Sequence, residues 1–300
     1  PFAETASQYA GAMIAPYCEA ESAEPIVRDL GLHAARLWRN IYPELVQNGT
    51  LVVASARDQG ELRRFQPMTV GHNVLDDAQI ADLEPDLGGR FHSGLFFMDE
   101  AHMATPEAMG DLLALARREG AVFHFGVGWD GSLPEGSDVV IDCRGIGARS
   151  VLKDLRGVRG ERLLVRTNEV ALSRPVRLLH PRHPLYVVPW GDGRFLVGAT
   201  VIETNDPRPM TVRSALELLG LAYALHPAFG EAQVEEMSAG VRPAFPDNVP
   251  RVVVGDKDTI IRVNGAFRHG FLLAPVMAEV VAGLLQDDDF AHPLLLRRSG

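Results

Sequence analysis

Two arginines in glycine-containing segments are the residues best suited to bind a small anion. Arg242 lies in Gly240-Val241-Arg242-Pro243, and Arg268 follows 26 residues later in Gly265-Ala266-Phe267-Arg268-His269-Gly270. A guanidinium group can bind a carboxylate through two parallel charge-assisted hydrogen bonds, which a lysine cannot do. The pair therefore predicts a carboxylate site, and the alternative for Arg242 is an arginine in a surface turn.

The glycines around Arg268 predict that a bound group comes close to the backbone. A strand is expected at 259–263, and an apolar helix follows Gly270. Glycine leaves space where any Cβ would collide, and the first turn of a helix offers unpaired N–H groups and a partial positive charge. We expect an electron-rich or anionic group here. The alternative is an ordinary strand, turn and helix with a solvated arginine.

A tyrosine and two further small-residue segments are also candidates. Tyr186 lies in an apolar strand, where a buried tyrosine with a satisfied hydroxyl is more common than a ligand-binding one. The segment Ala10-Gly11-Ala12-Met13 is small enough to pass close to a ligand, and an apolar run at 139–143 leads into Gly145.

Composition and charge exclude several classes of function. The chain has 300 residues, 46% of them hydrophobic, and its net charge of −10 argues against a nucleic-acid partner. No apolar run approaches the roughly 20 residues that span a bilayer. Cys18 and Cys143 fit neither a disulfide framework nor a metal site, so a cytoplasmic protein without a metal is expected.

The predicted strands include both parallel and antiparallel types. Apolar periodicity and helix-end signals predict helices at 24–45, 76–83, 105–118 (with Thr105 as the N-cap) and 211–225. Strands are predicted at 50–54, 94–98, 121–125, 139–143, 161–172, 185–188, 194–199, 233–241 and 259–263. The runs at 121–125 and 139–143 are of the buried parallel type, whereas the strands from 161 to 199 are antiparallel, with a hairpin turn at 191–193. We therefore expect a mixed α/β (α+β) fold.

These segments together resemble those of the D-amino-acid-oxidase-like family of FAD-dependent oxidoreductases. The stretch from Gly265 to Pro275 is similar to the family's C-terminal flavin signature, and Gly240 to Pro243 is similar to its Gly-(Leu/Val)-Arg-Pro motif. The resemblance covers essentially the whole chain and is greatest to the glycine oxidases of thiamine biosynthesis. It implies a Rossmann-like FAD-binding domain formed by 1–25, 100–158 and 242–300. An interleaved antiparallel substrate domain would be formed by 26–99 and 159–241.

The resemblance also implies roles for single residues. Arg242 would grip the substrate carboxylate and Tyr186 would reach it, while Arg268 would complete this clamp or serve the flavin. Non-covalent FAD would be bound by a set of mostly backbone positions: Ala10, Gly11, Ala12, Met13, Val127, Gly145, Gly265, Arg268, His269, Gly270, Phe271 and Leu272. His269 replaces an asparagine that is frequent in relatives, and a helix-capping histidine is its alternative. No catalytic residue beyond the flavin is expected.

One part of the family pattern does not occur in this sequence. The nucleotide fingerprint Gly-x-Gly-x-x-Gly, which lies between the first strand and the first helix, is expected about thirty residues before Pro1. We expect the intact gene product to contain it. The sequence-based interpretation is oxidation of a small amino acid, glycine first, to its imine with release of hydrogen peroxide. A D-amino-acid oxidase or dehydrogenase of broader specificity is the alternative enzyme. A non-catalytic fragment or subunit without its own fingerprint is the alternative from another class. A homo-oligomer is compatible with all three.

Overall fold

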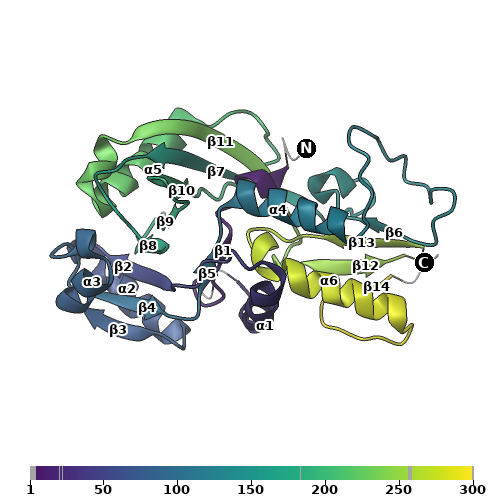
Figure 1. Ribbon diagram of the computed structural model, residues 1–300, viewed down its shortest axis with the longest axis horizontal. Coiled ribbons are helices and arrows are strands. Elements are labelled where there is room, and N and C mark those ends of the chain that lie inside the picture. Colours follow the sequence, from purple (N-terminus) through teal and green to yellow (C-terminus); the bar gives the residue numbers. More distant parts are fainter. Residues whose placement is uncertain (1–4, 20, 22, 183, 256–258, 299–300) are drawn as a thin grey trace.

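A computed structural model describes residues 5–298 except 20, 22, 183 and 256–258, so the first four residues of the predicted segment 1–25 lie outside it. The described chain forms one large and two smaller sheets with helices packed around them (Figure 1). The α-helices are α1 (Pro25–Ile41), α2 (Gln59–Phe65), α3 (Asp77–Leu83), α4 (Thr105–Arg118), α5 (Val212–Leu225) and α6 (Gly270–Gln286). The short 3-10 helices are η1 (Ala6–Tyr9), η2 (Ala56–Asp58), η3 (Gln66–Met68), η4 (Pro85–Leu87), η5 (Gly145–Ala148) and η6 (Pro227–Gly230).

The large sheet has eight strands from two distant parts of the chain. In spatial order they are β11 (Gln233–Ala244), β7 (Arg156–Arg166), β10 (Arg194–Gly198), β9 (Leu185–Pro189), β8 (Val176–Leu179), β2 (Thr50–Ala54), β4 (Ser93–Phe97) and β3 (Asn73–Asp76). Neighbours are antiparallel except β2 and β8, whose parallel pairing joins the two parts. The β9–β10 hairpin turns at Gly191, Asp192 and Gly193, all with positive φ, as the glycine-rich turn predicts.

A four-stranded sheet and a two-stranded ribbon complete the β-structure. The four-stranded sheet has the order β14 (Leu295–Arg297), β12 (Arg251–Val254), β13 (Ile260–Asn264) and β6 (Val140–Asp142). The ribbon pairs β1 (Met13–Ile14) with β5 (Ala101–His102). The mixed α/β fold predicted from the sequence is confirmed, and the predicted domain ranges remain a prediction. Helix α1, which falls in the range 26–99, packs against α6 through Gly31 and Leu272.

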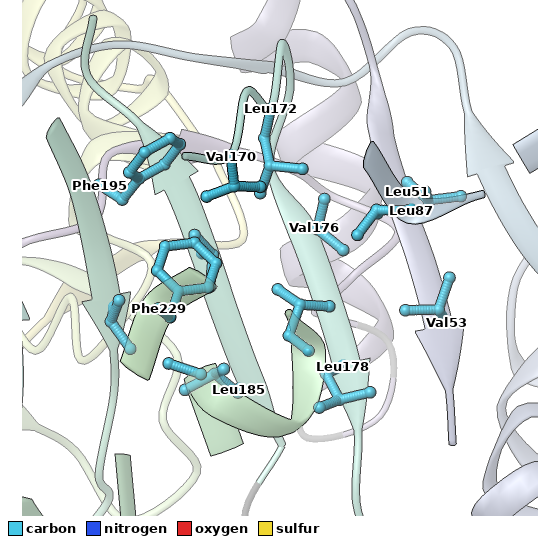
Figure 2. Packing of buried hydrophobic residues seen from close by; sticks show 14 of the residues in the cluster. Leu51, Val53, Leu87, Val170, Leu172, Val176, Leu178, Leu185, Phe195 and Phe229 are labelled. Carbon is cyan, nitrogen blue, oxygen red and sulfur yellow. The ribbon is translucent and has the colours of Figure 1, made fainter. Parts of the chain in front are cut away.

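One face of the large sheet is mainly apolar. Side chains alternate between the two faces of a strand, and one set of alternate positions forms the largest described core cluster together with α5 and η6. Figure 2 shows these side chains, among them Val53, Leu178, Leu185, Phe195 and Phe229, packed together over the strands. Phe195 and Phe229 meet edge to face with ring centroids 5.4 Å apart. This core fixes the sheet and leaves its other face to carry polar groups.

Several predicted elements are wrong in extent or absent. No strand forms at 121–125, where Val122 is 78% exposed and Phe123 and Phe125 stack on each other instead of on a neighbouring strand. The predicted strand 161–172 begins at Arg156 because the glycine-containing start of β7 pairs with the end of β11. Strands β1, β3, β5, β8, β12 and β14 were not predicted. Thr105 is the first helical residue of α4 rather than its N-cap, which is Ala104.

Within the part of the chain that the structure describes, no helix has the length and apolar character needed to cross a membrane.

Two leucines of α5 test the contribution of the apolar face. Leu218 is 3% exposed and lies in the core cluster, whereas Leu216 on the same helix is 67% exposed. We predict that Leu218→Ala lowers the free energy of unfolding by about 2–5 kcal/mol, since it removes buried methyl groups and leaves a cavity. The matched variant Leu216→Ala should stay within about 0.5 kcal/mol of the parent. Equal losses for the two variants in urea unfolding would show that α5 does not pack as described.

Candidate active site

The second face of the large sheet carries a row of polar and small residues. Residues directly opposite one another in neighbouring strands point to the same side of a sheet. The register places one row across five strands: Ser238, Arg162, Gly198, Tyr186 and Arg177. Arg242 points to the same side, because it lies opposite Val158, four residues from Arg162 on β7. This face therefore presents three guanidinium groups and one phenol.

Arg242 is a half-buried cation at the end of β11. Its guanidinium lies over Gly160, where a Cβ would collide with it, and Nη1 donates a hydrogen bond to the carbonyl oxygen of Thr200 at 3.1 Å. Burial and the charge of Arg268 lower the pKa of Arg242, whereas Tyr186 and Glu19 raise it. Among the described residues no carboxylate forms an ion pair with Arg242. The site thus holds a cation without a counter-ion.

Tyr186 lies between the sheet and the predicted small-residue loop. A Cβ added to Gly11 would come within 2.9 Å of Tyr186 Cε2, and one added to Gly198 within 3.2 Å of its hydroxyl oxygen. The ring therefore packs between the loop and β10, and the two glycines make room for it. The structure brings together the predicted residues Gly11 and Tyr186, which are far apart in the sequence.

The turn that carries Arg268 is attached to the end of β11. The Phe267 N–H donates a hydrogen bond to the Pro243 carbonyl oxygen at 2.8 Å, and Ala244 and Ala266 form an isolated bridge. These backbone contacts explain why Arg242 and Arg268, predicted from separate motifs, lie near each other. Arg268 differs from Arg242 because it has a counter-ion, Glu19, whose Oε2 is 3.3 Å from Arg268 Nε.

Glu19 also faces His269. Its Oε2 lies 3.3 Å from His269 Nδ1. Burial opposes ionisation of Glu19, but the charges of Arg268 and His269 lower its pKa to about 2. His269 occupies the N-cap position of α6, as its alternative interpretation predicts, yet its side chain makes no capping hydrogen bond. Both ring nitrogens are buried without a hydrogen-bond partner among the described residues.

The first turn of α6 places the remaining residues of the predicted flavin signature. The first N–H groups of a helix have no acceptor within the helix, and no described side chain caps those of Gly270, Phe271 and Leu272. The Phe271 carbonyl accepts a hydrogen bond from Trp38 Nε1 at 2.7 Å, which ties the turn to α1. The Leu272 side chain is core and packs on Gly31. A Cβ on Gly270 would meet no protein atom closer than 3.7 Å. No contact among the described residues therefore requires a glycine at this position.

Two predicted glycine turns lie side by side. Strands β6 and β13 are parallel neighbours, so their ends reach the same edge of the four-stranded sheet. Asn264 bridges the turns: its Nδ2 donates to the Gly145 carbonyl oxygen at 2.9 Å, and its Oδ1 accepts from the Gly265 N–H at 2.8 Å. Both glycines have positive φ, and a Cβ on Gly265 would collide with the Phe245 ring.

The loop from Ala10 to Met13 is held through its backbone. The Thr105 hydroxyl donates a hydrogen bond to the Ala10 carbonyl oxygen at 2.6 Å, and the Met103 N–H donates to that of Ala12 at 3.2 Å. Met13 then pairs with His102 in the ribbon. These hydrogen bonds and the strand pairing hold the loop next to Tyr186.

Val127 and Cys143 do not have the predicted surroundings. Val127 is 72% exposed in a segment without regular structure, so no strand end holds its backbone, and its role in FAD binding remains a prediction. Cys143 follows β6, which pairs in parallel as expected but is an edge strand, with Ile141 45% exposed. Cys143 itself is exposed, and its predicted burial in the core is wrong.

Sequence reasoning missed Arg162, Glu19 and Glu100. Arg162 is 2% exposed, on β7. A charged residue directly before Leu163-Leu164-Val165 was the signal that could have singled it out. Glu19 and Glu100 lie in segments without a recognisable motif, so only the fold reveals them.

Glu100 positions the chain that leads to Glu19. It is fully buried, and its carboxylate accepts hydrogen bonds from the Tyr17 N–H at 2.9 Å and the Cys18 N–H at 3.1 Å. The Cys18 thiol donates a third bond at 3.2 Å. Burial raises the pKa of Glu100 to about 7, although these donors act in the opposite direction. Glu100 thus ties the turn before Glu19 to the ribbon.

Two cavities differ in their relation to these residues. One of about 470 Å³ is lined by Arg57, Asp58, His180, Pro181 and Arg182 and includes none of the predicted site residues. Another of about 90 Å³ is bounded partly by Glu19, next to the turn that carries Arg268. The polar face, rather than the larger cavity, carries the candidate chemistry.

The donor set fits the predicted flavin. A flavin ring offers several nitrogen and oxygen acceptors and tolerates close backbone contact. The buried polar groups without a hydrogen-bond partner among the described residues include His269 Nε2 and Trp190 Nε1, and the uncapped turn of α6 adds backbone N–H groups. Such buried polar groups are costly when unpaired, so an additional bound group would satisfy them.

A family model and relatives of known name match the chain. Residues 1–284 match the model of the family described as DAO, FAD dependent oxidoreductase. The chain is 54% identical, over 92% of its length and 84% of the relative, to a Rhizobium etli protein assigned as the thiamine biosynthesis oxidoreductase ThiO. It is 24% identical to the glycine oxidase of Bacillus subtilis, covering 98% of this chain and 87% of the relative.

The fold is also similar to a solved structure. The crystal structure of glycine oxidase from Geobacillus kaustophilus superimposes with a TM-score of 0.80 at 21% identity, covering 98% of this chain and 89% of the other.

The buried Glu100 predicts how stability depends on pH. Its pKa is about 7 in the folded chain and close to 4.5 when unfolded, so its contribution is present below pH 4.5 and is lost as pH rises toward 7. Glu100→Gln is neutral throughout. We predict that the melting temperature of the variant minus that of the parent becomes more positive between pH 5 and pH 8. A difference that does not change with pH would contradict the assignment, and comparing the two proteins cancels the other titrating groups.

Proposed function

Because the chain belongs to the DAO family of FAD-dependent oxidoreductases, we propose that it oxidises glycine to its imine. In this reaction glycine and oxygen give iminoacetate and hydrogen peroxide. The ThiO relative supports a place in thiamine biosynthesis, where the imine serves thiazole formation, and the glycine oxidases support the substrate. A cytoplasmic location goes with this proposal.

The observation that carries the proposal is the different charge balance of the two predicted arginines. Arg268 is compensated by Glu19 at 3.3 Å, whereas Arg242 has only the Thr200 carbonyl oxygen as a partner among the described residues. A half-buried cation gains most from an added anion when it has no counter-ion. We therefore assign the substrate carboxylate to Arg242 and place Arg268, with Glu19 and His269, on the side of the cofactor.

The surroundings of Arg242 favour a small substrate. Tyr186 approaches the same space from β9, and its ring is packed between Gly11 and Gly198. A phenol hydroxyl can donate to the second carboxylate oxygen while the guanidinium binds the first. Fixing the carboxylate in this way orients the Cα–H and the amine, and orientation is the main contribution that the protein makes.

FAD, when bound, accepts the two electrons and passes them to oxygen. Non-covalent binding is proposed through the backbone of Ala10 to Met13, through the turns at Gly145 and Gly265, and through the first turn of α6. The exposed Cys143 is not needed as an anchor. Among the described residues, no group of three or more metal-ligating side chains occurs.

Arg242→Lys tests the carboxylate assignment. The variant keeps the charge but loses the planar fork, so one charge-assisted hydrogen bond is lost. We predict that kcat/KM for glycine falls by about ten- to a hundredfold while flavin content and melting temperature are retained. Arg208→Lys is the matched control, because the Arg208 side chain is 82% exposed and pairs with Asp206 away from this face.

Two outcomes of that measurement would contradict the assignment. Unchanged kinetics in Arg242→Lys would show that Arg242 does not bind the substrate carboxylate. Parallel loss of flavin, stability and activity would make Arg242 a structural residue. Methylamine serves as a substrate control, since it lacks the carboxylate, and turnover of methylamine equal to that of glycine would overturn the proposed function.

A further inference from the structure

Arg162 is a second buried cation with unused hydrogen-bonding capacity. It is 2% exposed, and only its Nη2 has carboxylate partners, the two oxygens of Glu236 at 3.2 Å. Nε and Nη1 are buried and have no hydrogen-bond partner among the described residues. The described residues therefore leave three N–H donors of this guanidinium, one on Nε and two on Nη1, without an acceptor.

Two aromatic rings fix the direction of the Arg162 side chain. Its guanidinium carbon lies 5.7 Å from the ring centroid of Tyr9 and 5.5 Å from that of Trp190, within the range of cation–π contact. Such contacts use the flat faces of a guanidinium, whereas its N–H bonds lie in the plane. The rings hold the group without satisfying Nε and Nη1.

Arg162 is close to the proposed carboxylate site. The Arg242 guanidinium lies over Gly160, two residues from Arg162 on the same face of β7, which is about 6.6 Å along a strand. Tyr9 connects the two positions, because its ring packs on Gly240 and also faces the Arg162 guanidinium. Tyr186 lies in the same cross-strand row as Arg162.

We propose that Arg162 forms a second anion subsite, which binds a second carboxylate of an amine substrate whose first carboxylate is bound by Arg242. The substrate class then includes secondary amines with two carboxymethyl arms as well as glycine. The proposal rests on the proposed function for the position of the first carboxylate. Burial lowers the pKa of Arg162, although Glu236 acts in the opposite direction.

Glu236 adjusts the strength of this subsite. Its side chain is 42% exposed, and it also accepts a hydrogen bond from the Ser238 hydroxyl. It compensates Arg162 while a substrate with one carboxylate is bound. It also competes with an added carboxylate, so its removal should strengthen binding of a second anion rather than weaken it.

Two ligands without an amine test the subsite independently of turnover. Oxydiacetate has two carboxylates, and propoxyacetate has an ethyl group in place of the second one. Neither contains the C–N bond that is oxidised. In calorimetric titrations of the flavin-loaded protein, we predict that oxydiacetate binds about ten- to a hundredfold more tightly than propoxyacetate. Equal affinities in the parent protein would overturn the proposal.

Variants then assign the preference to Arg162. In Arg162→Met, which keeps an unbranched side chain between the rings, the preference for oxydiacetate should be lost. Arg162→Lys should retain part of it and is the variant to use if Arg162→Met does not fold. Glu236→Gln should increase it several-fold. A structural role for Arg162 predicts instead that both ligands weaken by the same factor, and this result would overturn the proposal.

The same titrations separate this proposal from the proposed function. If glycine is not oxidised while oxydiacetate binding still depends on Arg162, the function fails and the subsite stands. If glycine is oxidised while the ligand preference is absent or independent of Arg162, the function stands and the subsite fails.

Discussion

The positive charge of the arginines in this site is only partly compensated by carboxylates. One face of the large sheet brings Arg162 and Arg242 together, and Arg268 joins them from the turn before α6. A buried cation is costly when it is not paired. Glu19 pairs with Arg268, and Glu236 pairs with part of Arg162. The remaining capacity, mainly that of Arg242, is what a carboxylate substrate would use.

The fold fixes the strands that carry these arginines and leaves space for their side chains. The apolar face of the sheet, filled by α5 and η6, fixes the strands so that the other face can carry charge. Glycines provide the space: Gly160 accommodates the Arg242 guanidinium, and Gly11 and Gly198 accommodate the Tyr186 ring. Glu100 holds the turn that presents Glu19, through three hydrogen bonds from residues 17 and 18. A change at any of these positions would act on the site through geometry rather than through direct contact.

The sequence allowed prediction of the parts of the site that have local signals. Arg242 and Arg268 lie in short glycine-containing motifs, and α4, α5 and the β9–β10 hairpin have clear start or turn residues. Partners formed only by tertiary contacts could not be predicted, because no periodicity links Glu19 to Arg268 or residues 50–54 to 176–179. The run at 121–125 has the composition of a strand, yet a strand also needs a pairing neighbour, and none occurs among the described residues. Val127, which follows this run, is also exposed and lies outside any strand.

We assign Arg242 as the counter-ion of the substrate carboxylate. The most direct test is a crystal structure of the flavin-loaded protein with methoxyacetate, a carboxylate that has no amine to be oxidised. We expect both carboxylate oxygens within about 3 Å of the Arg242 guanidinium, with Arg268 still paired to Glu19. A carboxylate bound to Arg268 in place of Glu19, with Arg242 contacting only the Thr200 carbonyl oxygen, would contradict it.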